Sequence, residues 1–421
     1  MRPSRPNDIC MSAFSHTVLS LSLRTYTEIP INMIHSIRFR CLGTVLAGMV
    51  GAISLDASAV MQQPTGRNDI VEAIRDRGAP VGDVIIFSRA SGGYDSDAPE
   101  KWGTNSWTCE SLSDTATGAC PTEPTWGGPG SATDINLSFK EEKTGATAIL
   151  TLEGSTLAEL HRTCSGAIAP SGIIGGSREP IEKAMLYILS NCPSNVYFDG
   201  RLLYVKIPAS ELKKLPSGGT WKANLKLNLR SWATINSPKL AVFRAEIKLD
   251  VTDKDNIQIY LPEFATATPI VDLKLRKLPN GSRMAGTSNV DLCLYDGYNA
   301  QSTWFDISAS DGLTVDRRDQ GQYSVLLDKD KSGSYESRVD YSLSLTYAGK
   351  KIALPNNEKV RLQGVNNTAG RSVSLPGISV PVICTPAPLT LETPEFQSVW
   401  KRPGKYSNKL TITFTPSSAN L

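Results

Sequence analysis

Short stretches in which apolar and polar residues alternate with a period of two recur through most of this chain. Such alternation is typical of β-strands that bury one face and expose the other, because successive side chains of a strand point to opposite sides of the sheet. Turn-forming residues at 216–219 and 279–281 separate these stretches. The pattern predicts an all-β protein, and its clearest examples are 202–207, 223–229, 243–249, 271–275 and 410–414.

Helical periodicity is scarce, and the best candidate helix is 179–189. Short strands between turn signals favour sandwiches of the immunoglobulin-like type. Because 421 residues exceed what one core of typical size uses, we predict two sandwich domains in tandem. The short polar break at 252–255 is the expected boundary, and its brevity predicts domains that stack end to end.

The N-terminal region carries the features of a secretory signal peptide. Two arginines precede an apolar run at 41–55, and an Ala-x-Ala cleavage site ends at Ala59. The run is too short to span a bilayer comfortably, which disfavours a membrane anchor. We therefore expect 33–59 to be a signal peptide, 1–32 to be an extension upstream of the true start, and the mature protein to begin at Val60.

Cysteine usage agrees with export. Six cysteines follow the expected cleavage site, an even number that favours three disulfides in an oxidising compartment. Fifteen pairings are possible for six cysteines, but pairing nearest neighbours keeps each bridge inside one domain. These pairs are Cys109 with Cys120, Cys164 with Cys192, and Cys293 with Cys384.

Charge and motifs argue against several function classes. A net charge of +3 without a Lys/Arg cluster excludes nucleic acid as an expected partner. The mature chain has His161 as its one histidine and no nucleophile elbow or phosphate loop, so we expect no enzyme and no cofactor. A polysaccharide-active enzyme would need a carboxylate pair. The candidates Glu141 with Glu142, and Asp253 with Asp255, are interpreted as exposed charges at strand ends.

No metal site is expected either. The cysteines lack the Cys-x-x-Cys spacing of zinc sites. Residues 328–333 resemble the start of a calcium loop, but Val339 stands at the twelfth position, where a bidentate Glu is needed. This segment is predicted to be a hairpin turn.

Six further segments carry a specific resemblance. They include Gly-Ala-Cys-Pro at 118–121 and Val-Asp-Leu-Cys-Leu-Tyr-Asp-Gly-Tyr at 290–298, and the others are 207–221, 252–262, 378–384 and 412–418. In this order they resemble the CfaE/CblD family of fimbrial tip proteins, the minor subunits of class 5 fimbriae and of related cable pili. The resemblance runs from about Cys109 to the C-terminus.

The resemblance implies a fimbrial tip adhesin that initiates pilus assembly. Residues 60–252 would form an adhesin domain and 256–421 a pilin domain, both immunoglobulin-like, with the pilin domain lacking its last strand. The implied partners are a periplasmic chaperone, an outer-membrane usher, the major pilin subunit as strand donor, and a host-cell glycan or glycoprotein. The protein would be exported through the periplasm to the fimbrial tip at the cell surface.

The last alternating stretch fits an incomplete sandwich independently of the resemblance. Leu410, Ile412 and Phe414 lie on one face of a strand, and no later strand follows to cover its edge. These three residues are the predicted lining of a groove for a donated strand.

The candidate receptor site lies in the adhesin half. In relatives, a pocket of arginines is thought to grip acidic glycans, and the corresponding positions here are Thr104 and the run 230–232, which keeps only Arg230 as a charge. Trp232, beside it, could stack on a sugar ring or pack in the core. The alternatives are a tip initiator without a receptor and a polysaccharide-active enzyme. Arg230 beside Trp232 favours the adhesin over the tip initiator, and the missing acid/base set argues against the enzyme.

The other tryptophans of this half divide between the same two roles. Trp107 adjoins Cys109 and is expected in the core, and Trp221 alternates with core positions and is expected to be structural. Trp102 and Trp126 remain candidates for sugar stacking.

Overall fold

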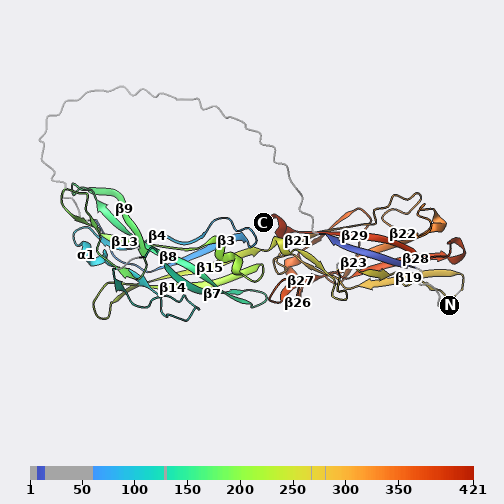
Figure 1. Ribbon diagram of the computed structural model, residues 1–421, viewed down its shortest axis with the longest axis horizontal. Coiled ribbons are helices and arrows are strands. Elements are labelled where there is room, and N and C mark those ends of the chain that lie inside the picture. The colour runs from blue at the N-terminus through green and yellow to red at the C-terminus, as the bar shows by residue number, and fades with distance from the viewer. Residues whose placement is uncertain (1–6, 15–59, 128–129, 267, 280) are drawn as a thin grey trace, which may run out of the picture.

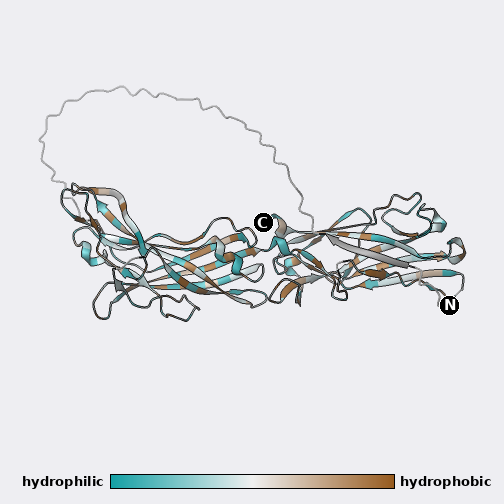
Figure 2. Cartoon of the chain, viewed as in Figure 1, coloured by the Kyte–Doolittle hydropathy of each residue, from teal (hydrophilic) through white to brown (hydrophobic). Residues whose placement is uncertain are grey.

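The computed structural model describes residues 7–14, 60–127, 130–266, 268–279 and 281–421. It shows two β-domains arranged end to end, with the C-terminus near their junction (Figure 1). Strands of both domains carry apolar and polar residues in turn (Figure 2). The all-β prediction is confirmed, because the single α-helix described, α1 (Pro99–Trp102), is one turn long and the remaining helical segments are short 3-10 turns.

The first domain is a sandwich whose strands form one continuous hydrogen-bonded path. Its order is β2-β4-β13-β8-β7-β14-β15-β3, with β5 attached to β14 and β9 to β8. The strands are β2 (Met61–Gln62), β3 (Arg67–Asp76), β4 (Val84–Asp95), β5 (Ser106–Thr108), β7 (Thr133–Glu141), β8 (Thr147–Arg162), β9 (Ile168–Pro180), β13 (Gly200–Ile207), β14 (Gly219–Arg230) and β15 (Lys239–Thr252).

The core of this domain is aromatic at its centre. Trp107 and Phe87 both contact Phe243 edge to face, with ring centroids 5.6 and 5.9 Å apart. Trp107 and Trp221 are fully buried, as predicted, and the indole N–H of Trp221 donates to the Ser217 carbonyl.

The predicted helix at 179–189 is wrong. The segment forms the end of β9 and two short strands, β10 (Lys183–Ala184) and β11 (Ile188–Leu189). β10 pairs with β6 (Thr125–Trp126), and β11 pairs with β12 (Val196–Tyr197). The pairing of β10 with the distant strand β6, the local pairing of β11 with β12, and the burial of Ile181 and Ala184 outweigh local helix propensity here.

The second domain is built around the path β17-β1-β29-β22-β23-β28-β19-β18, with β21 joining β29 to β25 and with β24 on β23. A small sheet, β16-β20-β27-β26, lies at the end near the first domain (Figure 1). The strands are β1 (Asn7–Phe14), β16 (Gln258–Tyr260), β17 (Ile270–Asp272), β18 (Arg276–Lys277), β19 (Arg283–Val290), β20 (Cys293–Tyr295), β21 (Trp304–Ser310), β22 (Tyr323–Leu327), β23 (Arg338–Tyr347), β24 (Lys350–Ala353), β25 (Lys359–Gln363), β26 (Arg371–Val373), β27 (Val382–Pro386), β28 (Leu389–Gln397) and β29 (Tyr406–Pro416).

The junction between the domains is short and hydrogen-bonded. Asn299 donates to the carbonyl of Gly218 (2.7 Å), and Lys143 Nζ donates to the carbonyl of Ala300 (2.7 Å). The backbones approach so closely that a Cβ on Gly218 would clash with the Gly297 carbonyl oxygen. Only glycine fits at this point of contact.

The prediction that Glu141 and Asp253 are exposed strand-end charges is wrong, because both are buried near this junction. Glu141 accepts hydrogen bonds from the backbone N–H groups of Lys143 and Thr144. Asp253 pairs with Arg77 at 2.9 Å, and its burial raises its pKa. Each carboxylate can be buried because neighbouring donors hydrogen-bond to it.

The six cysteines form three disulfides between nearest neighbours along the chain, two in the first domain and one in the second. The predicted signal peptide at 33–59, and most of 1–32, lie outside the described residues. In the part of the chain that is described, no helix has the length and apolar character needed to cross a membrane.

Candidate functional site

The last strand of the second domain, β29, has two edges with different kinds of partner. One edge pairs with β21 and β22, which belong to the same domain. Along the other edge, the only strand among the described residues is β1, which comes from the N-terminal segment before the first domain. No described strand of 256–421 pairs with that edge.

β1 fills a slot between β29 and β17. It runs parallel to β29 over eight register positions, from Asn7 opposite Tyr406 to Phe14 opposite Thr413, and antiparallel to β17. Figure 1 shows β1 as the blue strand among the red and orange strands of the second domain. We call this slot the groove. Its walls are β29 and β17, and the strand that it holds here comes from outside the domain.

The predicted groove residues lie on β29 as expected. Leu410, Ile412 and Phe414 are buried and belong to the hydrophobic core of the second domain. The ring of Phe414 contacts that of Phe305 on β21 edge to face, with centroids 4.9 Å apart. The core face of β29 is thus continuous with the rest of the sandwich.

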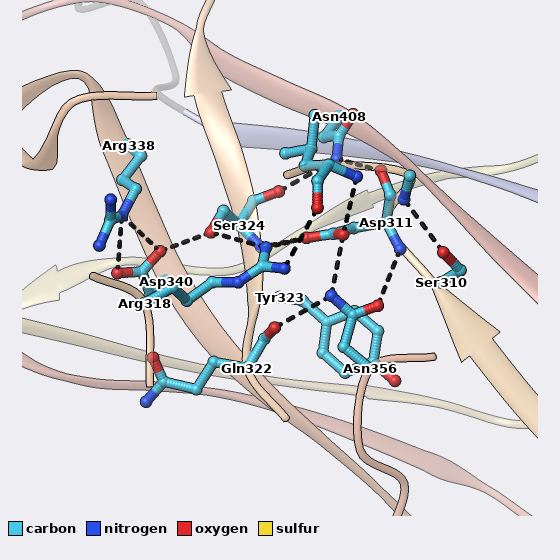
Figure 3. A network of polar contacts seen from close by, with 12 residues as sticks. Ser310, Asp311, Arg318, Gln322, Tyr323, Ser324, Arg338, Asp340, Asn356 and Asn408 are labelled. Carbon is cyan, nitrogen blue, oxygen red and sulfur yellow. Dashed lines mark hydrogen bonds and ion pairs between the residues drawn. The ribbon is translucent and has the colours of Figure 1, made fainter. Parts of the chain in front are cut away.

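A polar network fixes β29 from the edge that pairs with β21 and β22. The side-chain amide of Asn408 donates to the carbonyls of Asp311 (2.9 Å) and Ser324 (3.1 Å), as Figure 3 shows. Arg318 binds the Asp311 carboxylate, and the Ser324 hydroxyl donates to Asp340. Because these contacts involve no residue of β1, one wall of the groove is positioned whatever strand occupies it.

A second candidate site lies at the free pole of the first domain, opposite the junction. Arg230 ends β14 there, with Ser106 of β5 opposite it on one side and Lys239 of β15 on the other. Its guanidinium donates to the Thr108 hydroxyl (3.2 Å) and to the Ser237 carbonyl (2.8 Å), and lies 3.5 Å from Glu123. Arg230 therefore holds the loop that follows β14.

Two tryptophans meet at this pole. Trp232 lies in the loop held by Arg230, and its ring centroid is 5.3 Å from that of Trp126 on β6, with the rings tilted by 46°. Trp126 is 53% exposed and Trp232 is partly exposed. The pair presents an apolar, aromatic surface beside a cation.

Thr104, the third predicted receptor residue, is not on this surface. It is 8% exposed, and its hydroxyl lies 3.5 Å from the carbonyl of Glu100. Trp102 is also buried. Sequence reasoning did not identify Trp126 as the partner of Trp232, because nothing in the sequence indicates that β6 and the loop after β14 adjoin.

The segment that resembles a calcium loop connects β22 to β23, as the hairpin prediction requires. Asp328 binds Lys331 (3.0 Å), and Asp330 binds Arg402 (2.8 Å) and the Ser337 hydroxyl. No group of three or more metal-ligating side chains suited to an ion occurs among the described residues.

Comparison with known proteins gives matches to both domains. Residues 56–254 match the family model for the first domain of CfaE, a fimbrial subunit of CFA/I, and residues 257–418 match the model for its second domain. The CfaE protein of Escherichia coli is 32% identical over 344 residues, which cover 75% of this chain and 81% of that protein.

Solved structures agree. The crystal structure of CfaE, the adhesive subunit of CFA/I fimbria of enterotoxigenic Escherichia coli, is similar with a TM-score of 0.61 and 26% identity, covering 85% of this chain and 99% of CfaE. A chaperone–tip adhesin complex of CFA/I fimbriae biogenesis is similar with a TM-score of 0.60 and 27% identity, covering 85% of this chain and 98% of the matched chain.

Proposed function

Because the chain belongs to the CfaE family, a family of non-enzymatic fimbrial adhesin subunits, we propose that it binds a host-cell glycan or glycoprotein through its first domain and initiates pilus assembly through its second. A fimbrial subunit of this family belongs to a fibre at the cell surface. The proposed place of this chain is the tip, reached by export through the periplasm.

The observation that carries the assembly role is the second edge of β29. A strand with an edge that its own domain leaves unpaired is a template for a strand from elsewhere. That edge pairs here with β1, a strand from outside the domain. In the mature protein proposed to start at Val60, β1 is absent, and a strand from another protein takes its place.

Two kinds of protein are proposed to supply that strand in turn. The chaperone–tip adhesin complex formed by a similar protein supports a periplasmic chaperone as the first partner. The N-terminal extension of the major pilin would replace the chaperone at the outer-membrane usher. Each donor would bury apolar side chains against Leu410 and Ile412, and each fully buried side chain is worth about 1.5–3 kcal/mol.

The receptor role is supported by the aromatic pair at the free pole. Flat apolar faces such as those of Trp126 and Trp232 stack on the C–H face of a sugar ring, while Arg230 and neighbouring polar groups can bond its hydroxyls. Since the guanidinium of Arg230 already binds Thr108 and Ser237, we assign it to positioning Trp232 as well as to the receptor.

A fusion tests the assembly role. The N-terminal extension of the cognate major pilin is appended after Leu421, which lies near the junction, where Lys254 donates to its carbonyl. A strand starting there runs down the groove antiparallel to β29. We expect the fusion to raise the melting temperature sharply and to suppress aggregation of the chain starting at Val60.

The matched control is the same fusion with charged residues at the alternate donor positions that face the groove. It should leave the melting temperature at the value of the unfused chain. If the unfused chain is already monomeric and as stable as the fusion, the proposed assembly role is wrong.

A further inference from the structure

A patch of exposed apolar side chains lies at the end of the second domain that faces away from the first. It consists of Tyr335, Val399 and Trp400, here called the distal patch. Val399 is 82% exposed and Trp400 is 55% exposed, and the rings of Tyr335 and Trp400 lie 6.3 Å apart. Large exposed aromatic and aliphatic side chains that gather in one place indicate an interaction surface.

The distal patch adjoins the start of β29. Val399 and Trp400 belong to the turn that follows β28, and Tyr335 lies just before β23. The hydroxyl of Tyr406, the first residue of β29, donates to the Arg402 carbonyl (2.5 Å) and lies 3.2 Å from the Glu336 carbonyl oxygen. Arg402 and Glu336 neighbour the patch on either side. The patch therefore lies at the Tyr406 end of β29.

The distal patch is also held in place. The ammonium group of Lys401 lies 3.3 Å from the centre of the Tyr335 ring and donates to the Tyr335 carbonyl. Burial lowers the pKa of Lys401 to about 8. Arg402 pairs with Asp330 at 2.8 Å. An anchored surface loses less conformational entropy on binding than a mobile one.

The opposite end of the groove is closed by the first domain. The residues after β29 bond across the domain end: Ser417 accepts from the backbone N–H of Thr303 (2.9 Å), and Ser418 donates to the Asp296 carbonyl (2.6 Å). The first domain begins directly beyond them (Figure 1). The Tyr406 end faces away from the first domain, so a separate subunit that donates a strand to the groove has room there for its globular part.

We propose that the distal patch is the docking surface for the globular body of the pilin subunit that donates its strand to β29. The inference rests on the proposed assembly role and adds a second contact to it. Since the body follows the donated extension in sequence and lies at the Tyr406 end, the donated strand runs antiparallel to β29. An aromatic anchor such as Trp400, ringed by less important contacts, is typical of an interface hot spot.

The experiment measures strand exchange into the complex of the full mature chain with its chaperone. Two donors are compared: a free peptide of the major pilin N-terminal extension, and the whole major pilin delivered with its own chaperone. Trp400→Ala and Val399→Ser should leave exchange with the peptide unchanged and slow exchange with the whole subunit about tenfold, which corresponds to about 1.4 kcal/mol.

The first domain offers matched controls. Trp126→Ala and Val81→Ser remove side chains that are 53% and 84% exposed, close to the values for Trp400 and Val399, and should change neither rate. Equal rates for wild type and the Trp400 variant with the whole subunit would overturn the docking surface alone. Failure of the peptide to enter the wild-type groove would overturn the assembly role and, with it, the docking surface.

Discussion

The last strands of the two domains occupy equivalent positions but obtain their second partner differently. In the first domain, β15 pairs with β14 on one edge and with β3 on the other, and β3 runs parallel to it over ten register positions. In the second domain, β29 pairs with β21 and β22 on one edge and with the parallel strand β1 on the other. β3 belongs to its own domain, whereas β1 lies before the first domain in sequence.

The second domain lacks a strand that the first domain has. A strand beside the last strand completes both sandwiches, and the first domain supplies this strand itself. The second domain has every other element of a closed core, including a network that fixes β29 through Asn408 (Figure 3). Its missing part is one strand, which is the part that we propose another protein provides.

The largest difference between the domains is expected on removal of a disulfide. Cys293–Cys384 spans 91 residues and Cys109–Cys120 spans 11. In the chain-entropy model these bridges stabilise by about 5 and about 3 kcal/mol. The double variant Cys293→Ala/Cys384→Ala should therefore lower the free energy of unfolding more than Cys109→Ala/Cys120→Ala, measured by denaturant titration of the strand-completed fusion. The reverse order would show that the second domain does not depend on its long bridge.

Truncation of one core leucine in each domain should show whether that domain depends on a donor strand. Leu249 on β15 and Leu410 on β29 are both fully buried, and Leu→Ala in a core costs about 2–5 kcal/mol. Leu249→Ala should show this cost with or without a donor strand. Leu410→Ala should show it only in the fusion, because the strand-free groove leaves Leu410 poorly packed. Equal costs for Leu410→Ala in both forms would contradict an open groove.

A smaller effect is expected at the free pole of the first domain. Trp126→Ala or Trp232→Ala should weaken receptor binding by about 0.5–1.5 kcal/mol, or about two- to twelvefold, through loss of aromatic stacking. The measurement is titration of the strand-completed protein on a glycan array and on epithelial cells. Trp400→Ala, at the far end of the second domain, serves as the control and should bind normally. Unchanged binding by both pole variants would remove the aromatic pair from the receptor site.

The smallest predicted effects are on the pH dependence of the unfolding free energy, and they have opposite signs in the two domains. Burial raises the pKa of Glu159 in the first domain, so its contribution to stability is present below its ordinary pKa of 4.5 and is lost as the pH rises through the raised value. The hydrogen bond from Arg361 lowers the pKa of Asp306 in the second domain, so its contribution is present above 3.8 and is lost as the pH falls through the lowered value.

Substitution should remove each dependence separately. Glu159→Gln should flatten the decline in unfolding free energy above pH 4.5, and Asp306→Asn should flatten the decline on the acid side of pH 3.8. Denaturant midpoints between pH 3 and pH 7 test both. A variant whose profile parallels that of the wild type would show that its carboxylate does not contribute in this way.

Local patterns predicted much of the fold. The alternation at 223–229 and 243–249 corresponds to β14 and β15 because each strand buries one face, and Leu410, Ile412 and Phe414 face the core for the same reason. One-sided burial leaves a signal of period two that the sequence carries without knowledge of strand order.

Features that depend on distant contacts were not predictable. Residues 179–189 form short strands because their partners, such as β6, come from elsewhere in the chain. Glu141 and Asp253 are buried because the two domains meet near them. The polar break at 252–255 indicates a boundary, but it does not indicate which side chains the meeting domains bury. The pairing of Trp126 with Trp232 and the role of β17 as a groove wall likewise depend on three-dimensional arrangement.

Amide hydrogen exchange of β29 tests directly whether the second domain lacks a strand. It is measured on the chain starting at Val60, with and without the donor strand fused after Leu421. We expect rapid exchange of the β29 amides that face the groove in the unfused chain, strong protection of the same amides in the fusion, and protection of β15 in both. If the amides of β29 are as well protected as those of β15 in the unfused, chaperone-free chain, the second domain is complete without a donated strand and the account is wrong.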